Sequence, residues 1–164
     1  MKGKVGHKMT LQGTRQLPIS VQVERKTDVR SQFAALCWRV KNGRPEILMI
    51  TSRRTGRWII PKGWPMSGRT PAEGALQEAW EEAGVCGKPS DRSLGLFSYL
   101  KRLDDGTSLP CVAMVYPVKV SKLEKDFPEA GERKRKWVTP KKAAQMVFEP
   151  ELAQILKNFD PRLL

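Results

Sequence analysis

Histidine is almost absent from this sequence. The chain holds one, His7, near its N-terminus. Catalysis by a Ser–His–acid or Cys–His arrangement and zinc binding by histidine clusters all need this residue at the site, so the sequence disfavours them. Any chemistry must therefore rest on carboxylates, cations and a hard metal that prefers oxygen ligands.

Cysteine is also scarce, and long apolar runs are missing. The three cysteines are scattered without a CxxC spacing, which predicts reduced thiols and a cytoplasmic location. No stretch approaches the roughly 18–20 consecutive apolar residues of a membrane helix. Residues 1–30 lack the apolar segment of a secretory signal. We therefore expect a soluble protein with no membrane partner.

Positive charge, in contrast, is abundant. The chain has 30 Lys and Arg against 17 Asp and Glu, giving a net charge of +13 and a pI near 10.0. Such an excess attracts polyanions, which include nucleic acid, an anionic membrane surface and a small molecule with several phosphates. Net charge does not choose among them, and a solvated basic surface is the alternative explanation.

The 164 residues fit one folded domain preceded by an arm. Residues 1–30 are basic and poor in apolar periodicity, which predicts a partly flexible N-terminal arm. Residues 31–164 form the predicted domain. Apolar patterns there predict strands at 32–40, 46–52, 58–60, 94–103, 109–120 and 136–138, and helices at 140–147 and 150–159. This order predicts an α/β domain with a mixed sheet.

The clearest helix in the sequence is predicted at 71–83. Thr70 suits the N-cap, Pro71 the first helical position, and Glu73 completes a capping box. Gly84 stands where a left-handed residue ends a helix.

Three glutamates share one face of that helix. Glu78, Glu81 and Glu82 stand at i, i+3 and i+4, where like charges repel. No Lys or Arg occurs between residues 70 and 87. An ordinary solvated acidic face is the alternative, but the preceding glycine-rich loop at 61–68 lets backbone approach a metal or phosphate closely. The combination favours a Mg²⁺ site, with Mn²⁺ as a second candidate.

Residues 63–85, GWPMSGRTPAEGALQEAWEEAGV, resemble the Nudix box GX5EX7REUXEEXGU, the loop–helix signature of Nudix hydrolases. Several positions of that signature carry the expected residue here: Gly63, Glu78, Glu81, Glu82, Gly84 and Val85, with Ala79 at the first aliphatic position. Two positions depart from it: Arg69 replaces the first glutamate, and Gln77 replaces the arginine. In the family these two residues brace the loop and orient a glutamate, so the departures concern loop geometry more than metal binding.

The resemblance implies a Nudix-type α/β/α sandwich with a mixed β-sheet. It also implies that Glu78, Glu81, Glu82 and the backbone carbonyl of Lys62 hold the metal. Glu81 or Glu82 would orient or deprotonate the attacking water. Gly63 and Trp64 belong to the loop beside this site, where Trp64 is equally compatible with stacking on a nucleobase and with packing.

Residues 30–160 further resemble the branch of diphosphoinositol polyphosphate phosphohydrolases, which also handles dinucleoside polyphosphates. The shared stretches include RWIIP at 57–61 and GERKRKW at 131–137. The phosphate-contacting positions of that branch align with Arg30, Thr51, Arg53, Arg102 and Arg133. For each arginine taken singly, a solvated or salt-bridged side chain is an equal alternative. A cationic position of that branch near Glu149 is missing here.

The resemblance therefore implies Mg²⁺-dependent hydrolysis of a phosphoanhydride bond in a polyphosphorylated small molecule, by a monomer or homodimer. One alternative is a Nudix hydrolase of nucleoside triphosphates, nucleotide sugars or RNA 5′ ends, and the basic arm keeps RNA as a candidate partner. Another is a non-catalytic module that binds nucleotides or RNA.

Overall fold

The computed structural model describes residues 16, 18 and 29–164. Most of the predicted arm, including His7, lies outside the described residues, so the arm stays a prediction. Residue 30 is already part of the first strand, next to the expected domain start at residue 31.

The described part of the chain forms a mixed sheet of eight strands. Their order is β3-β2-β1-β7-β5, and β4, β6 and β8 pair with β1, β7 and β2 respectively. The β1–β7 pair is parallel and the other pairs are antiparallel. The strands span β1 Arg30–Lys41, β2 Arg44–Thr51, β3 Trp58–Ile59, β4 Lys62–Gly63, β5 Val85–Pro89, β6 Gly95–Arg102, β7 Ser108–Leu123 and β8 Arg135–Val138.

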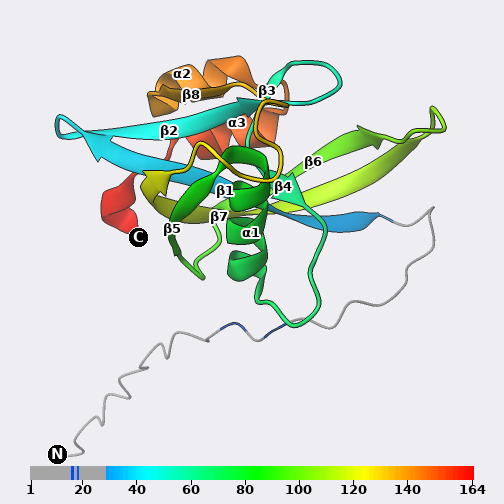
Figure 1. The fold of residues 1–164 in the computed structure, drawn as a ribbon, viewed down its shortest axis with the longest axis horizontal. Coiled ribbons are helices and arrows are strands. Elements are labelled where there is room, and N and C mark those ends of the chain that lie inside the picture. The colour runs from blue at the N-terminus through cyan, green and yellow to red at the C-terminus, as the bar shows by residue number, and fades with distance from the viewer. Residues whose placement is uncertain (1–15, 17, 19–28) are drawn as a thin grey trace, which may run out of the picture.

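Helices cover both faces of the sheet (Figure 1). Helix α1, Pro71–Ala83, packs on one face, and α2, Pro140–Met146, and α3, Pro150–Lys157, pack on the other. Alternate residues of β1 supply the two cores: Ala35 faces α1, while Leu36 faces α2 and α3. A short 3-10 helix, Pro161–Leu163, follows. The predicted α/β/α sandwich with a mixed sheet is therefore confirmed.

Helix α1 has the predicted bounds and caps. The Thr70 hydroxyl accepts from the Glu73 amide at 3.2 Å, and the Glu73 carboxylate accepts from the Thr70 amide at 3.1 Å. Gly84 closes the helix at φ 68°, a conformation that glycine adopts without steric cost. Four buried alanines, Ala72, Ala75, Ala79 and Ala83, form the face that contacts the sheet. Small side chains there bring the helix close to the sheet.

Two strands were missed by the apolar pattern. Lys62–Gly63, expected as loop, pairs with β1 opposite Phe33 and Ala34. Val85–Pro89 pairs with β7 through a register shift after Cys86. Both segments are short and contain Lys, Gly or Pro, which are poor strand formers, so long-range pairing decides their conformation. No helix within residues 29–164 has the length and apolar character needed to cross a membrane.

Candidate active site

The carboxylate of Glu78 lies directly against the backbone of Gly63. A Cβ built on Gly63 would stand 2.1 Å from the Glu78 carboxyl carbon. The absence of a side chain at residue 63 is therefore what lets the acidic helix meet β4. On the same strand, the Lys62 amide donates to Glu82 Oε2 at 3.4 Å.

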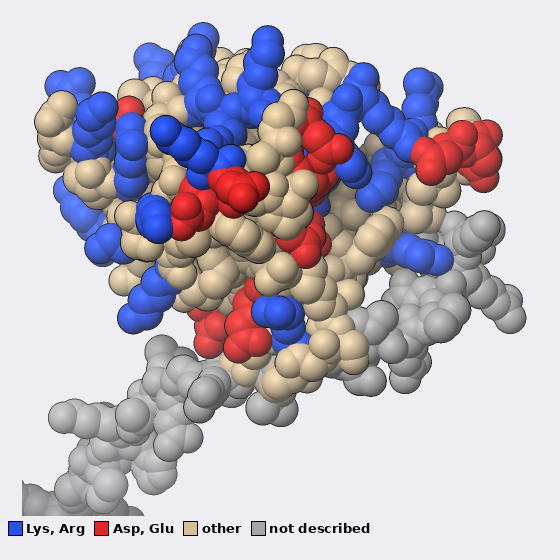
Figure 2. Space-filling model, viewed as in Figure 1, with Lys and Arg blue, Asp and Glu red and all other residues tan. Residues whose placement is uncertain are grey.

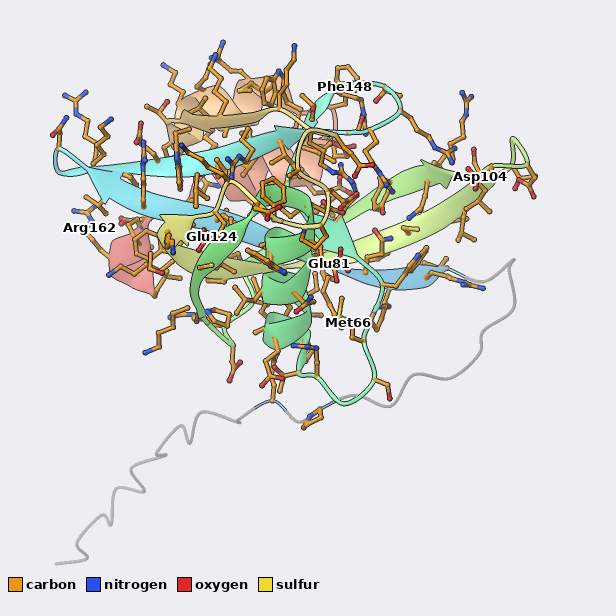
Figure 3. All side chains as sticks on the ribbon, viewed as in Figure 1. Met66, Glu81, Asp104, Glu124, Phe148 and Arg162 are labelled. Carbon is orange, nitrogen blue, oxygen red and sulfur yellow. The ribbon has the colours of Figure 1, made fainter. Side chains whose placement is uncertain are left out.

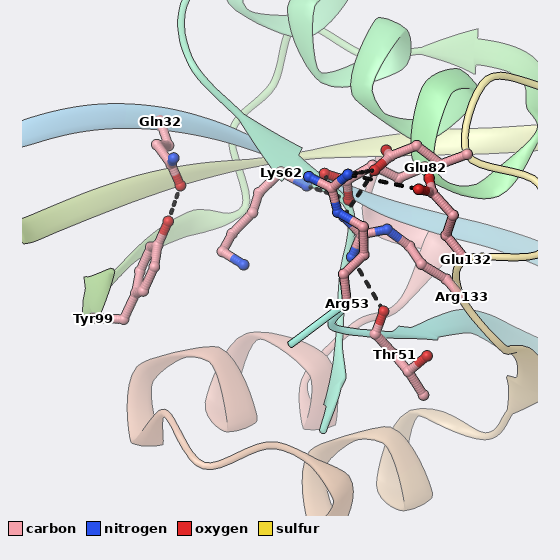
Figure 4. A network of polar contacts seen from close by, with 9 residues as sticks. Gln32, Thr51, Arg53, Lys62, Glu82, Tyr99, Glu132 and Arg133 are labelled. Atoms are coloured by element: carbon pink, nitrogen blue, oxygen red, sulfur yellow. Dashed lines mark hydrogen bonds and ion pairs between the residues drawn. The ribbon is translucent and has the colours of Figure 1, made fainter. Parts of the chain in front are cut away.

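Glu82 is buried, with 7 % of its surface exposed, and faces a cation from another part of the chain. Arg133 Nη2 lies 3.5 Å from Glu82 Oε1, and Arg133 Nη1 donates to the Thr51 carbonyl at 3.1 Å. Figure 4 shows this network, with Arg53 beside it. Arg133 thus links the acidic helix to the end of β2.

A fourth carboxylate, Glu129, joins the site from the loop before β8. It lies 3.3 Å from Arg133 and 3.1 Å from Arg53, and its backbone amide donates to the Glu81 carbonyl at 3.0 Å. Reasoning from the sequence missed Glu129 because it lies outside the Nudix box. Its place beside the matched GERKRKW stretch is the only signal that could have indicated it.

Glu81 is oriented by a neighbour one helical turn earlier. Gln77 Nε2 donates to Glu81 Oε1 at 3.0 Å, and Figure 3 shows Glu81 on α1. Gln77 is one of the two departures from the Nudix box, and an amide here supplies a donor without adding charge. At the other departure, Arg69 is exposed, and its side chain makes no hydrogen bond or ion pair with any described residue.

Burial makes two of these carboxylates difficult to ionise. Burial, followed by repulsion from Glu82, Glu81 and Glu129, raises the pKa of Glu78 to about 7. Burial also raises the pKa of Glu82 to about 7, although Arg133 and Lys62 oppose the shift. Folding therefore disfavours the charged form of both carboxyls, and the neighbouring cations do not fully offset the effect of burial.

Next to these acids opens a pocket of about 460 Å³. Among the described residues that line it, Glu82 is the one acid, and seven are cations: Arg53, Arg54, Arg57, Lys62, Lys101, Arg102 and Arg133. Figure 2 shows acidic side chains near the middle of this face with Lys and Arg on both sides. Guanidinium groups arranged around a concave surface suit a ligand with several phosphates.

The Lys62 side chain is a further feature of this pocket. Burial lowers its pKa below the ordinary value, while Glu82 and Glu149 act in the opposite direction. Its ammonium lies 4.9 Å from the ring centre of Tyr99, whose hydroxyl donates to Gln32 (Figure 4). Lys62 therefore offers a side-chain cation as well as the backbone carbonyl that the sequence suggested.

The predicted residues divide into two groups in the structure. Arg53, Lys62, Glu82, Arg102 and Arg133 line the pocket together. The predicted residues outside its lining are Arg30, Thr51, Gly63, Trp64, Glu78 and Glu81.

Thr51 and Trp64 already have partners within the protein. The Thr51 hydroxyl accepts from the Lys134 amide at 2.9 Å. The ring of Trp64 is faced by Lys101 at 4.6 Å and by Arg30 at 5.8 Å.

The acidic side chains do not form a preformed metal-binding site. Within the described residues, no group of three or more His, Cys, Asp or Glu side chains could hold a metal ion as placed. These carboxylates are directed toward side chains of the protein instead of toward one another: Glu82 faces Arg133, and Glu81 accepts a hydrogen bond from Gln77.

Fold and site together define a three-layer α/β domain in which an acidic helix borders a cationic pocket. Residues 30–160 match the family model of the Nudix domain. The chain therefore belongs to the Nudix family.

Several known proteins are similar to it. Nudix hydrolase 12, mitochondrial, from Arabidopsis thaliana is 30% identical over 70% of this chain and 58% of its own length. Diphosphoinositol polyphosphate phosphohydrolase 3-beta from Homo sapiens is 31% identical over 79% of this chain and 77% of its own length. The chain thus spans 58% of the length of the plant relatives it matches.

Solved structures share the fold at lower identity. A C. elegans Ap4A hydrolase binary complex superposes with a TM-score of 0.60 at 18% identity, covering 82% of this chain and 98% of the other. The Nudix domain of Shewanella oneidensis NrtR, complexed with ADP ribose, has a TM-score of 0.60 at 15% identity, covering 84% and 90%.

Proposed function

We propose that this protein hydrolyses a phosphoanhydride bond in a polyphosphorylated small molecule, with a divalent cation held by the acidic helix. The observation that carries the proposal is that the acidic helix borders the pocket: the buried Glu82 of this helix lines it together with seven described cations. A site with only acidic side chains would suit a metal ion without substrate, and a site with only cationic side chains would suit an anion without metal. Their combination suits a metal–polyphosphate pair.

The donor chemistry of the site fits Mg²⁺ or Mn²⁺. Glu78, Glu81 and Glu82 supply carboxylate oxygens, and the Lys62 carbonyl supplies a backbone oxygen, the ligand type that these ions prefer. The raised pKa values of Glu78 and Glu82 mark charge that a bound cation would stabilise. Glu129 adds a further carboxylate beside them. A divalent cation held by these residues would supply neutralisation of phosphate charge and a more acidic water.

The residues of the chain then have distinct roles. Glu81 or Glu82 accepts the proton of the attacking water as general base. Arg53, Arg102, Arg133 and the Lys62 ammonium hold the phosphates and stabilise the charge that develops on them. Since in-line displacement at phosphorus needs mainly positioning and charge neutralisation, no covalent nucleophile is required.

Diphosphoinositol polyphosphates and dinucleoside polyphosphates are the substrates that we propose first. Relatives named as diphosphoinositol polyphosphate phosphohydrolases and a structural neighbour named Ap4A hydrolase support this choice, as does the cationic pocket. Nucleoside triphosphates, nucleotide sugars and RNA 5′ ends are the alternative substrates for the same chemistry. A cytoplasmic location stays a prediction, and the plant relatives carry organellar names.

The test is turnover of a substrate panel with Mg²⁺. Diadenosine polyphosphates, diphosphoinositol phosphates, nucleoside triphosphates and nucleotide sugars are compared by phosphate or nucleotide release. We expect Glu82→Gln to lower the rate at least about 100-fold, the usual contribution of a general base. Glu151→Gln, an exposed acid at the start of α3 on the opposite face of the sheet, is the matched control and should keep full activity.

Calorimetry with Mg²⁺ separates the two parts of the proposal. Wild type should take up the ion, and Glu82→Gln should take it up more weakly. If wild type and Glu82→Gln are equally inert on the whole panel and neither binds Mg²⁺ or Mn²⁺, the catalytic proposal is refuted. The non-catalytic alternative then stands.

A further inference from the structure

One apolar face of the sheet is largely open where β1, β6 and β7 extend together past α1 (Figure 1). Residues directly opposite each other on paired strands point to the same side of a sheet. Leu96 of β6 lies opposite Met114 of β7, which packs against the core beneath α1, and Leu100 lies opposite Pro110. The exposed fractions are 52 % for Leu96 and 69 % for Leu100. Contiguous apolar surface of this kind marks an interaction site.

A pocket lies at the far end of this face, where the N-terminal arm meets the sheet. Its volume is about 280 Å³, and Val29, Leu100, Pro110 and Val112 are among the residues that line it. Val29 directly precedes β1 and is 61 % exposed. The arm therefore joins the domain at the edge of the open apolar face.

The arm is also attached near the other end of the same face. Gln16 Nε2 donates to the Tyr116 hydroxyl at 3.0 Å. Tyr116 is buried on β7, and the alternation of side chains along a strand places it on the same side as Met114 and Val112. Gln16 and Val29 therefore hold the two ends of the intervening segment at one apolar surface.

The segment between these two anchors has a suitable length to cross the face. Arg30 pairs with Cys111, five residues before Tyr116 on β7, which is about 17 Å along a strand. Residues 17–28 span up to about 40 Å when extended. They are thus long enough to run along the face and to turn back into β1.

The sequence of this segment matches the surface. Its first half departs from the low apolar periodicity of the arm, because apolar side chains occupy every second position: Leu17, Ile19, Val21 and Val23. Such alternation is typical of a strand with one apolar side. The polar sequence ERKTD follows at residues 24–28, which suits a solvent-exposed return to β1.

We propose that residues 17–23 dock in extended form on this face, with their four alternating apolar side chains against those of β6 and β7. The chain's own arm is favoured over a second copy, because attachment at Gln16 and Val29 raises its effective concentration at the surface. The arm leads into Arg30, whose guanidinium lies 5.8 Å from the ring centre of Trp64 in the loop before α1. Docking therefore also positions a side chain beside the acidic site. The inference is independent of catalysis.

The test uses the alternation itself. Ile19→Asp and Val21→Asp place a charge on the apolar side of the segment, whereas Ser20→Asp and Gln22→Asp, the matched controls, place the same charge on the opposite side. Urea unfolding of the full chain is measured for each variant. We expect each of the first two to raise the unfolding equilibrium constant at least about tenfold, the effect of one buried aliphatic side chain, and each control to change it less than about twofold.

A second substitution locates the docked segment. Leu100→Asp alters an exposed residue of the face, so Val21→Asp in that background should change the unfolding equilibrium constant less than about twofold, because contacting residues are not additive. Leu163→Asp is the control background, since Leu163 is 67 % exposed and belongs to the 3-10 helix after α3. There Val21→Asp should keep its full effect.

The inference is overturned if all four arm variants behave alike, or if Val21→Asp keeps its full effect in Leu100→Asp. Sedimentation equilibrium should give the same molecular mass for wild type and Val21→Asp. A wild-type dimer that dissociates in Val21→Asp would assign the face to a second copy and would equally overturn the inference.

Discussion

The glutamates of α1 illustrate how much a single residue depends on its partners. Glu78, Glu81 and Glu82 share a helix face, but each has a different environment: Gly63 backbone for Glu78, Gln77 for Glu81, and Arg133 for Glu82. Each environment sets where the carboxylate points. Substituting a partner is therefore expected to disturb the site as much as substituting an acid.

Gln77 is expected to act as a positioning residue for Glu81. In Gln77→Ala the 3.0 Å hydrogen bond is lost, and the Glu81 carboxylate becomes free to rotate. We expect kcat to fall about 10- to 100-fold, the range seen when a group that orients a metal ligand is removed, with KM little changed.

Gln77→Arg restores a donor and should recover most of the activity, as a merely structural defect would not. Gln145→Ala, at an exposed position of α2, is the control. Equal activity of wild type and Gln77→Ala would contradict the role.

The raised pKa of Glu78 makes stability depend on pH in the metal-free protein. Its pKa is about 7 in the folded chain against the ordinary value of 4.5, so folding favours the protonated form. This contribution is fully present below about pH 4.5 and is lost as the pH rises through 7. Above pH 7, the free energy of unfolding of Glu78→Gln should therefore be higher than that of wild type. The expected difference is on the order of 1 kcal/mol, because partial exposure of Glu78 screens the repulsion.

Urea unfolding in EDTA at pH 5 and pH 8 measures this difference. At pH 8, added Mg²⁺ should stabilise wild type more than Glu78→Gln, since the ion replaces the missing positive charge. Glu151→Gln serves as the control. A variant that is less stable than wild type at pH 8 in EDTA would show that the carboxylate is compensated by other groups.

At the scale of elements, the junction of β4 with α1 determines the site. Strand β4 has two residues, and its pairing with β1 places Gly63 under Glu78. The capping box of α1 and the small alanines of its buried face then fix the helix at that distance. The sequence showed the glycine and the helix separately, whereas their contact depends on the sheet.

Gly63→Ala should damage the site while leaving the fold nearly intact. The new Cβ would overlap the Glu78 carboxylate, and this flexible side-chain end can move away at small cost to stability. We expect Mg²⁺ affinity and kcat to fall at least about tenfold, measured by calorimetry and turnover.

Gly74→Ala on the same helix is the matched control. Its Cβ would meet Phe33 at an ordinary 3.5 Å, and alanine in a helix interior should add about 0.5–1 kcal/mol of stability. Gly63→Ala with unchanged Mg²⁺ affinity would indicate that Glu78 is not a ligand.

At the scale of the whole molecule, the question is whether net charge or its local arrangement attracts the substrate. The chain carries +13, and many of its cations lie outside the pocket. Within the pocket, cations come from the β2–β3 loop, β4, β6 and the loop before β8. Segments far apart in sequence thus line one pocket.

Two substitutions with the same change in net charge separate these effects. Arg102→Gln removes a pocket cation, and Lys142→Gln removes an exposed cation of α2. We expect kcat/KM to fall about tenfold in the first, the loss of one charged hydrogen bond, and less than about twofold in the second. The measurement is kcat/KM across a range of ionic strength. Equal decreases in both variants would instead indicate long-range attraction by the net charge.

The sequence by itself determined the elements whose signals are local. The bounds of α1 follow from Thr70, Glu73 and Gly84, because caps act over one helical turn, and the shared face of the three glutamates follows from helical periodicity. The Nudix box and the α/β order were sufficient for the fold. Only the tertiary structure decided that β4 and β5 are strands. It also decided that Glu129 and Arg133 lie near Glu82 and that the pocket cations are grouped together. These depend on sheet pairing between distant segments, a long-range property that periodicity and spacing do not contain.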